Sequence, residues 1–175
     1  MRPLVPHPSQ AASPYRLTAT AERSSNHQLR LHYRLDGDLT DIRLPPPAPI
    51  QRGTLLWQHT CFEAFVGRVG ESPYQELNFS PSGAWDAHAF TGYRHGGPMA
   101  LDTTAPTMTI RRSPHAVEIA AAVVVELPGA VWRIALSAVI EHRDGHLSYW
   151  ALHHPPGQPD FHHPSAFLLQ LDPSA

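Results

Sequence analysis

Residues 28–35 read QLRLHYRL, and this stretch decides the fold class. Every second residue from Leu29 to Leu35 is large and apolar, and the residues between them are Arg or His. A period of two places alternate side chains on opposite faces of an extended chain, so one face is apolar and the other is solvated. The Asp-Gly-Asp sequence at 36–38 is typical of a turn, and residues 15–21 are predicted to form the preceding strand. The stretch therefore predicts the first antiparallel pair of a β-sheet.

Short apolar runs separated by turn residues continue through the rest of the chain. They predict strands at residues 61–67, 74–80, 84–90, 107–112, 116–125, 132–141, 147–152 and 167–171. The 19 prolines leave few windows for a long helix, because an interior proline removes a hydrogen bond and clashes with the preceding turn. This spacing is typical of an all-β fold, and we predict an antiparallel, jelly-roll-like β-sandwich of about ten strands.

Two segments allow more than one interpretation. The run AVEIAAAVVVEL at residues 116–127 is compatible with a helix, but its valines and its flanking prolines favour a strand buried on both faces. The proline-rich run LPPPAPIQRG at residues 44–53 cannot form a central strand, and too few residues precede it for a separate domain. We therefore predict a crossing loop there and one domain over residues 1–175, in which residues 1–14 form a loosely ordered N-terminal segment.

The composition argues against several classes of protein. Charged residues make up 16% of the chain, the formal net charge is −2, and no run of basic residues is present, so nucleic acid is not an expected partner. No apolar stretch is long enough for a signal peptide or a membrane span. A single cysteine, Cys61, excludes an internal disulfide framework. We expect a cytoplasmic protein that does not bind membranes.

Motifs for nucleophilic catalysis and for nucleotide binding are missing from the sequence. It contains neither a GxSxG elbow nor a glycine-rich phosphate or dinucleotide motif. Cys61 lies in the apolar run HTCFEAF rather than at a helix start that would lower the pKa of its thiol, so we predict that it is buried. These observations lead us to expect a protein that is not an enzyme and that carries no cofactor.

The block from residue 55 to residue 94 combines aromatic and hydrogen-bonding side chains. In extended strands Glu63 shares a face with Trp57, and Glu76 shares a face with Asn78. Sugar recognition needs this mixture, because pyranose rings stack on aromatic side chains while their hydroxyl groups require planar donors and acceptors. The predicted ligand-binding residues are Trp57, Glu63, Glu76, Asn78, Trp85 and Trp150. The alternative is that the tryptophans fill the core and the polar residues form a solvated face.

The 13 histidines suggest an alternative site for a metal ion or a haem iron. The candidate ligands are His59, His153, His154, His162 and His163. Adjacent histidines on an extended chain point to opposite sides, so only one of each pair could easily face a common ion. No zinc-binding spacing adds specificity to this alternative.

Three stretches also resemble a known family. They are LWQHTCFEAFVG at residues 56–67, YQELNFSPSGAWDAHAFTGYR at residues 74–94 and SYWALHHPPGQPDFHHPSAFLLQL at residues 148–171. Together they resemble the DOMON-like domains related to family 9 carbohydrate-binding modules, especially the bacterial stand-alone group. The resemblance implies a β-sandwich whose concave sheet binds sugars in the carbohydrate modules and haem in some other DOMON members. It matches Trp57 and Glu63 to a Trp and a carboxylate of the binding face, and places Glu76 near a polar sugar contact.

We therefore predict a non-catalytic domain that binds a small-molecule ligand, either a carbohydrate or another polyol, on a concave sheet face. The alternatives are a haem- or metal-binding protein and a hydrolase that uses Glu63 and Glu76 as a carboxylate pair. The loop at residues 150–164 contains four prolines and four histidines. We predict that this loop folds against the sandwich with Trp150 and Phe161 as apolar anchors.

Overall fold

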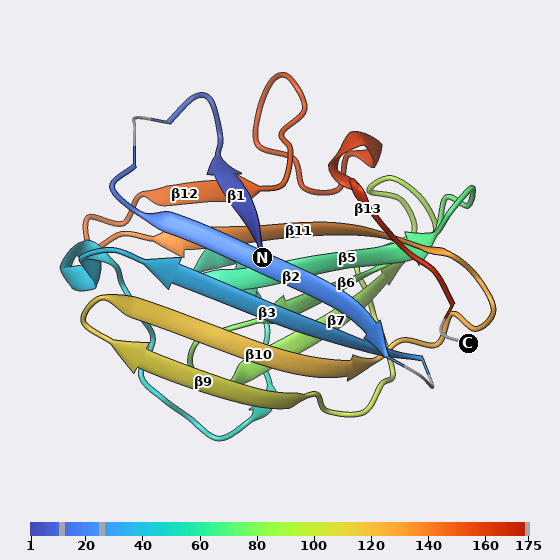
Figure 1. Ribbon diagram of the computed structural model, residues 1–175, viewed down its shortest axis with the longest axis horizontal. Coiled ribbons are helices and arrows are strands. Elements are labelled where there is room, and N and C mark those ends of the chain that lie inside the picture. The colour runs from blue at the N-terminus through green and yellow to red at the C-terminus, as the bar shows by residue number, and fades with distance from the viewer. Residues whose placement is uncertain (11–12, 25–26, 174–175) are drawn as a thin grey trace.

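The computed structural model describes residues 1–10, 13–24 and 27–173 (Figure 1). Within these residues the chain forms 13 strands and only short 3-10 helices, so the all-β prediction is confirmed. A front layer in Figure 1 contains, in spatial order, β2 (Arg16–Ser24), β3 (Gln28–Asp36), β10 (Ala116–Val124) and β9 (Thr107–Ser113). A rear layer contains β4 (Gln51–Arg52), β7 (Ala84–Phe90), β6 (Tyr74–Phe79), β5 (Cys61–Arg68), β11 (Trp132–Glu141) and β12 (Leu147–Ala151). Two short strands pair at its sides, β8 (Met99–Ala100) with β7 and β13 (Leu169–Leu171) with β11.

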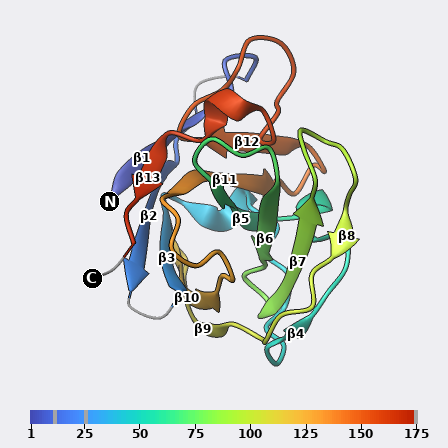
Figure 2. The ribbon, with the colours of Figure 1, turned by 90° about the vertical axis from the view of Figure 1, so that its right-hand side faces the viewer.

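The two layers belong to one curled sheet rather than to two separate sheets. The first strand, β1 (Arg2–Pro6), pairs with β2 through Leu4 and with β12 through Val5 and Pro6, so hydrogen bonding is continuous from the rear layer to the front layer (Figure 2). Strand pairing is antiparallel except between β4 and β7, which are parallel. The structure thus gives an all-β fold whose two halves face each other, and the finer description as a two-sheet jelly roll is not what the pairing shows.

Strand β1 corrects the prediction that residues 1–14 are loosely ordered. The segment contains no obvious alternation, and two of its five residues are proline, which hid the strand in the sequence. Its side chain at Leu4 is nevertheless buried in the main core. Each end of the strand pairs with a different partner, so β1 needs few consecutive hydrogen bonds to either one.

The front layer confirms the alternation that decided the fold class. Leu29, Leu31 and Leu35 on β3 are buried, and β3 pairs along its whole length with both β2 and β10. Strand β10 corrects the prediction of burial on both faces. Val117 and Val123 face the core, whereas the residues between the core-facing positions are exposed or half-buried, because none of the described strands forms a second layer over the outer face of the front layer.

The main core lies between the two layers and contains apolar side chains from both. Phe62 of β5 contacts the ring of Tyr33 of β3, with ring centroids 5.3 Å apart. The Tyr33 hydroxyl donates a hydrogen bond to the carbonyl oxygen of Glu63 at 2.6 Å, so the front layer holds the backbone of the rear layer at that residue. The side chain of Trp132 is fully buried, and its indole N–H donates to the carbonyl of Leu127.

The proline-rich segment at residues 44–53 is a crossing connection, as predicted. It runs from the 3-10 helix η1 (Leu39–Asp41) after β3 to the short strand β4, which adds to the far edge of the rear layer.

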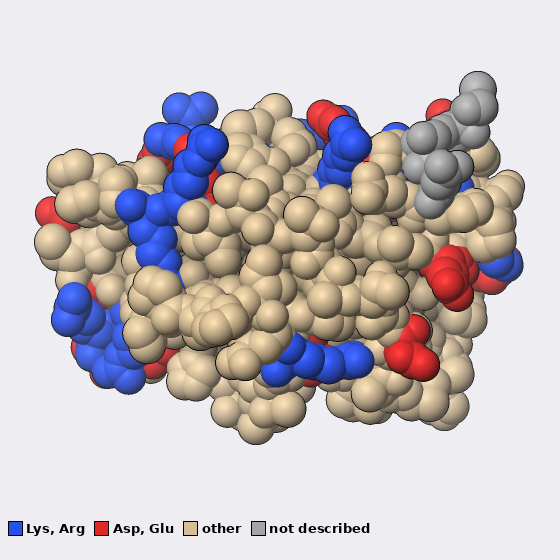
Figure 3. All heavy atoms as spheres, turned by 90° about the horizontal axis from the view of Figure 1, so that it is seen from below, with Lys and Arg blue, Asp and Glu red and all other residues tan. Residues whose placement is uncertain are grey.

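Charged side chains are sparse on the face shown in Figure 3, where most of the surface belongs to uncharged residues. None of the helices in the described ranges is long and apolar enough to cross a membrane.

Candidate functional site

The outer face of the rear layer, which points away from the main core, carries an unusual set of buried polar side chains. Glu63 of β5 pairs in register with Asn78 of β6, and Asn78 pairs with Asp86 of β7. Glu76 of β6 pairs with His88 of β7. Residues that pair directly across an antiparallel ladder share a face, so all five side chains lie on the outer face. Each of them is buried.

A cavity of about 520 Å³ lies over part of this face. Glu63, Glu76 and Val139 of β11 contribute to its lining from the sheet. The other lining residues come from η2 (Leu56–Gln58), β7, the loop after β7, β12 and the loop after β12: Trp57, Gln58, Phe90, Arg94, Gly97, Pro98, Leu147, Tyr149, Pro159, Phe161 and His162. The cavity therefore combines a sheet that carries two carboxyl groups with largely aromatic surroundings.

Glu63 is the most deeply buried carboxyl group of the cavity, with 2% of its surface exposed. Its Oε1 atom has no hydrogen-bond partner of good geometry among the described residues. The hydroxyl group of Ser137, which pairs with Glu63 from β11, lies close enough to the carboxyl group to oppose part of the rise in its pKa. Burial and, second, the charge of Glu76 raise the pKa of Glu63 well above its usual range. The structure thus favours a protonated Glu63, which can donate a hydrogen bond as well as accept one.

Glu76 lies near Glu63 on the neighbouring strand, where Asn78 supports it. The side-chain amide of Asn78 donates to Oε1 of Glu76 at 2.8 Å, and Oε2 lies 3.8 Å from Nε2 of His162. Burial raises the pKa of Glu76, although the hydrogen bond from Asn78 opposes the shift. Two buried carboxyl groups on neighbouring strands cannot both ionise easily, and the larger pKa rise at Glu63 favours a proton there.

A second wall of the cavity comes from two loops that are far apart in the sequence. Arg94, in the loop after β7, has a positive φ of 49° and donates to Asp160 through Nε at 3.2 Å and Nη2 at 2.8 Å. The Tyr93 hydroxyl donates to the other oxygen of Asp160. This clamp fixes the segment after Asp160, which places Phe161 and His162 at the cavity.

His162 is neutral in this environment. Its Nδ1 atom lies 2.8 Å from the Tyr74 hydroxyl, and its ring packs edge-on against Phe65 and Phe90. Burial and, second, the positive charge of Arg94 lower the pKa of His162 to about 4. At neutral pH the imidazole therefore offers the cavity a hydrogen-bonding group without a positive charge.

Gly97 shows how closely the loop after β7 approaches its strand. A Cβ atom at this position would lie 2.6 Å from the carbonyl oxygen of Ala89 and 2.7 Å from the ring of Phe90. Any larger residue would push the loop away from β7. Because Gly97 and Pro98 both line the cavity, this close approach helps to set the shape of the site.

The structure brings together three of the six predicted ligand-binding residues at the cavity: Trp57, Glu63 and Glu76. Trp57 lies in a 3-10 helix before β5 rather than in an extended strand, and its half-buried ring packs edge-on against His88 at 5.7 Å. Asn78 is fully buried beside Glu76 and does not line the cavity. Its role is to hold the carboxyl group of Glu76.

The structure corrects the placement of Trp85 and Trp150, which lie in the main core. Trp85 precedes Asp86 on β7, and adjacent residues of a strand point to opposite faces, so the indole faces the front layer. Trp150 follows Tyr149 on β12 in the same way, and Tyr149 lines the cavity in its place. For these two tryptophans the alternative interpretation, that they fill the core, is the one that the structure supports.

Several residues in or beside the cavity were not predicted as site residues. Asp86 and His88 alternate with apolar residues in AWDAHAF, so their shared face could have been inferred from the same two-residue period of a strand that placed Glu63. Asp86 accepts from Arg52 at 2.9 Å and lies 3.2 Å from Nε2 of His88. Arg94 and Tyr149 have no comparable local signal, because only the folded loops and strands bring them to the cavity.

The five histidines of the alternative metal or haem site contact different parts of the chain. His59 pairs with Glu141, His154 with the carbonyl of Val5, His162 with Tyr74, and His163 caps the 3-10 helix η3 (Pro164–Ala166). His153 is exposed. In the described residues no group of three or more His, Cys, Asp or Glu side chains is arranged to hold a metal ion.

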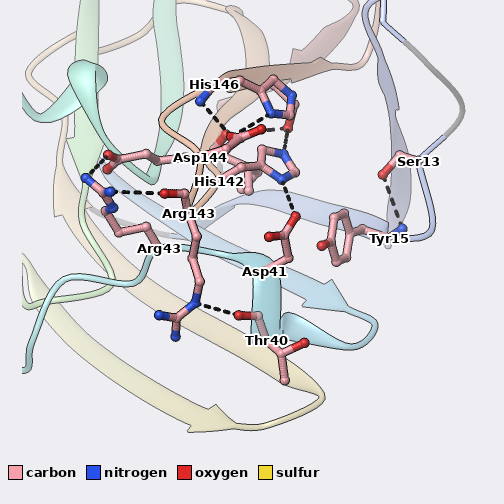
Figure 4. Close-up of polar contacts among 12 residues, drawn as sticks. Ser13, Tyr15, Thr40, Asp41, Arg43, His142, Arg143, Asp144 and His146 are labelled. Carbon is pink, nitrogen blue, oxygen red and sulfur yellow. Dashed lines mark hydrogen bonds and ion pairs between the residues drawn. The ribbon is translucent and has the colours of Figure 1, made fainter.

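A different pair of histidines does come together, in the turn between β11 and β12 (Figure 4). The rings of His142 and His146 stack with centroids 4.0 Å apart. His142 also contacts Ser148 and Asp41, and the backbone N–H of His146 donates to Asp144. These contacts tie the turn to η1, and none of the residues lines the cavity.

The predicted anchoring of the loop at residues 150–164 is borne out at one of its two anchors. Phe161 is buried in a second apolar cluster on the outer face of the rear layer, close to Tyr149 and His154. Trp150 belongs instead to β12 and to the main core.

Cys61 is buried and unpaired as predicted, and burial raises the pKa of its thiol well above the usual range.

Comparison with known proteins adds one finding about the fold. No family model and no curated protein sequence matches the chain. Among solved structures, the chain is similar to one described as a "putative carbohydrate-binding protein" from Bacteroides uniformis. The two share 16% sequence identity and superpose with a TM-score of 0.61 over 99% of this chain and 85% of the other. The fold of this chain is therefore one that also occurs in that protein.

Proposed function

We propose that this protein binds a small carbohydrate or a similar polyol in the cavity of the rear layer and does not catalyse a reaction on it. The observation that carries the proposal is the Glu63 carboxyl group, which is buried in the cavity lining with Oε1 left without a partner. An orphaned buried polar atom is costly, so its presence in a cavity marks a place where a ligand supplies the missing hydrogen bond. Cavities that bind small molecules typically combine apolar walls with a few polar groups of this kind.

The side chains around the cavity have the two properties that a sugar ring requires. Trp57 and Tyr149 offer aromatic surface for the apolar face of a pyranose. Glu63, Glu76 and His162 offer hydrogen-bonding groups to its hydroxyls. Burial raises the pKa of both carboxyl groups and favours a proton on Glu63, so that the pair offers a donor as well as acceptors. The fold similarity to a protein described as carbohydrate-binding supports the same ligand class.

We also infer that the chain is related to DOMON-like domains and family 9 carbohydrate-binding modules. The support is the resemblance of the three sequence stretches, together with the all-β fold and the fold similarity described above. The chemistry of the cavity is independent of this relationship. The two inferences therefore stand on different observations and can be tested separately.

Tryptophan fluorescence tests the binding proposal, because only one of the four tryptophans lines the cavity. Trp85, Trp132 and Trp150 are buried in the main core, whereas Trp57 is half-buried at the site. We expect a saturable change in emission when glucose, galactose, xylose, cellobiose or inositol is added at millimolar concentration. The change should disappear in Trp57→Phe, which keeps the three core tryptophans. An unchanged spectrum with every ligand, confirmed by calorimetry, would contradict the proposal.

The carboxyl pair also supports a second candidate, a hydrolase. Glycosidases use two carboxyl groups that flank the scissile bond, and Glu63 and Glu76 line one cavity. Release of 4-nitrophenol from a panel of aryl glycosides tests this candidate. Turnover that is abolished in both Glu63→Gln and Glu76→Gln would support a hydrolase, and binding without turnover would support the non-catalytic function.

A further inference from the structure

The charged groups around the cavity do not balance. Four carboxyl groups lie in or beside it, at Glu63, Glu76, Asp86 and Asp160, and two arginines accompany them. Arg94 forms its ion pair with Asp160 and Arg52 forms its ion pair with Asp86, so each arginine is matched by one of these two outer carboxylates. Among the described residues no arginine forms an ion pair with Glu63 or Glu76, although the charge of Arg94, which lines the same cavity, lowers the pKa of Glu76 less than burial raises it.

The other side chains that surround Glu63 and Glu76 supply little positive charge. His162, 3.8 Å from Glu76, is neutral at pH 7 because its pKa is about 4. Asn78 donates a neutral hydrogen bond to Glu76, and Cys61 beside Asn78 holds a protonated thiol. His88 faces Glu76 from β7 with its Nε2 atom 3.2 Å from Asp86, and it lowers the pKa of Glu76 less than burial raises it. The elements that surround the pair therefore leave negative charge that a bound ligand can neutralise.

Resting on the proposed function, we infer that the cavity selects a ligand that carries a protonated amino group, and that an amino sugar is the class of carbohydrate it binds. The ammonium group would lie against the Glu63 and Glu76 carboxyl groups, while the ring occupies the aromatic part of the cavity. An ammonium group has three donors and no acceptor, which suits a site whose carboxyl group at Glu63 lacks a partner at Oε1. Charge-assisted hydrogen bonds of this type are about twice as strong as neutral ones.

Such a ligand changes the protonation of the pair. Without it, burial and the charge of Glu76 favour a proton on Glu63. A bound ammonium group stabilises the ionised forms, so binding releases this proton to the solvent. A neutral sugar has no such effect, because it leaves the preference for the protonated form in place.

Calorimetric titration of the full chain with four ligands tests the inference: glucosamine, glucose, N-acetylglucosamine and cyclohexylamine. We expect glucosamine to bind roughly tenfold more tightly than glucose at pH 7 and low salt, because one charge-assisted hydrogen bond contributes about 1.5 kcal/mol or more. Titration of glucosamine in two buffers with different ionisation enthalpies should show proton release. The same comparison with glucose should show none.

Isosteric variants locate the effect. Glu63→Gln and Glu76→Gln should each reduce the preference for glucosamine over glucose to less than about threefold, because each removes a carboxyl group that can be ionised against the ammonium group and keeps the shape of the side chain. Glu71→Gln is the matched control, since Glu71 is exposed in the turn that joins the same two strands. It should retain the full preference.

The outcomes separate this inference from the proposed function. Equal binding of glucose and glucosamine by the natural chain would overturn the preference for an amino group while supporting carbohydrate binding. Binding of cyclohexylamine without binding of any sugar would support the ammonium site and overturn the carbohydrate proposal. Binding of none of the four ligands would overturn both. These comparisons use the natural chain, so they do not depend on the folding of any variant.

Discussion

The two faces of strands β5, β6 and β7 are both buried, yet they are built from different side chains. The core face carries Phe62, Leu77 and Phe79, which pack against the front layer. The outer face carries Glu63 and Glu76, together with the other buried polar groups of these strands, and is covered by the loops after β7 and β12. Burial is thus shared by the two faces, whereas close packing against a second layer of the sheet is found on only one of them.

This difference indicates a division between stability and binding. The core face buries apolar surface against the front layer, and the resulting hydrophobic effect stabilises the fold. The outer face contains carboxyl groups with raised pKa values and an orphaned oxygen, which do not stabilise the fold. Groups that reduce stability and line a cavity are typical of functional sites.

The largest expected effect comes from removing one ring from each face. Phe62→Ala should lower the free energy of unfolding by about 3–5 kcal/mol, because Phe62 is fully enclosed and the change leaves a cavity in the main core. Phe90→Ala makes the same change at a residue that already borders the cavity, so its effect should be smaller. Urea unfolding measures both. A loss for Phe90→Ala that equals or exceeds that for Phe62→Ala would contradict the division between the faces.

An intermediate effect is expected for the clamp that Tyr93, Arg94 and Asp160 form between the two loops that cover the cavity. Asp160→Ala removes the partner of Arg94 and Tyr93, which should lower the free energy of unfolding by about 1 kcal/mol. The free energy of ligand binding should fall by a larger fraction of its own value. His163→Ala is the control, because His163 caps η3 and does not line the cavity. A large fall in melting temperature with unchanged binding would make the clamp a structural feature only.

The clamp also has a defined pH dependence. Burial raises the pKa of Asp160, but hydrogen bonds from Tyr93 and Arg94 outweigh it and hold the pKa below its ordinary value. A lowered pKa in the folded state gives stability that is present above the unfolded-state pKa and is lost as the pH falls through the folded-state pKa. The stability difference between the natural chain and Asp160→Ala should therefore shrink under acidic conditions, as urea unfolding at several pH values can measure.

The effect of Glu63→Gln depends on the pH, and its sign is opposite. The pKa of Glu63 is raised in the folded state, so the folded chain holds a proton that the unfolded chain releases, and stability falls as the pH rises above the unfolded-state pKa of about 4.3. Glutamine cannot ionise, so the variant should match the natural chain near pH 4 and become the more stable of the two as the pH rises. Thermal melting of both chains at several pH values from about 4 upward checks the sign of this stability difference. A variant that becomes less stable with rising pH would contradict the electrostatic description of Glu63.

Much of the fold could be predicted because alternation is a local property. All ten predicted strands are present, with ends that differ by a few residues, since each needs only its own pattern of apolar and polar side chains. Strand β1 was missed because its pairing is split between β2 and β12, which no local pattern encodes. Burial of only one face of β10 was missed because the sequence does not say which layers of a fold are covered.

The candidate site was predictable to a smaller extent. Glu63 and Glu76 could be identified because their parity in neighbouring strands places them on one face. Trp85 and Trp150 could not be assigned to a face in the same way, because a tryptophan is equally compatible with a core and with a binding surface. Arg94, Asp160 and His162 depend on contacts between loops more than 60 residues apart in the sequence.

The sequence by itself determined ten of the 13 strands, the turns between them and the alternation of side chains within them, because these depend on neighbouring residues along the chain. The tertiary structure alone decided which face of the rear layer meets the front layer, and therefore that Trp85 lies in the core while Glu63 and Glu76 line a cavity. The physical reason is that pairing, curling of the sheet and closure of the loops are long-range choices. They are made by the total burial of apolar surface, to which each strand contributes only a part.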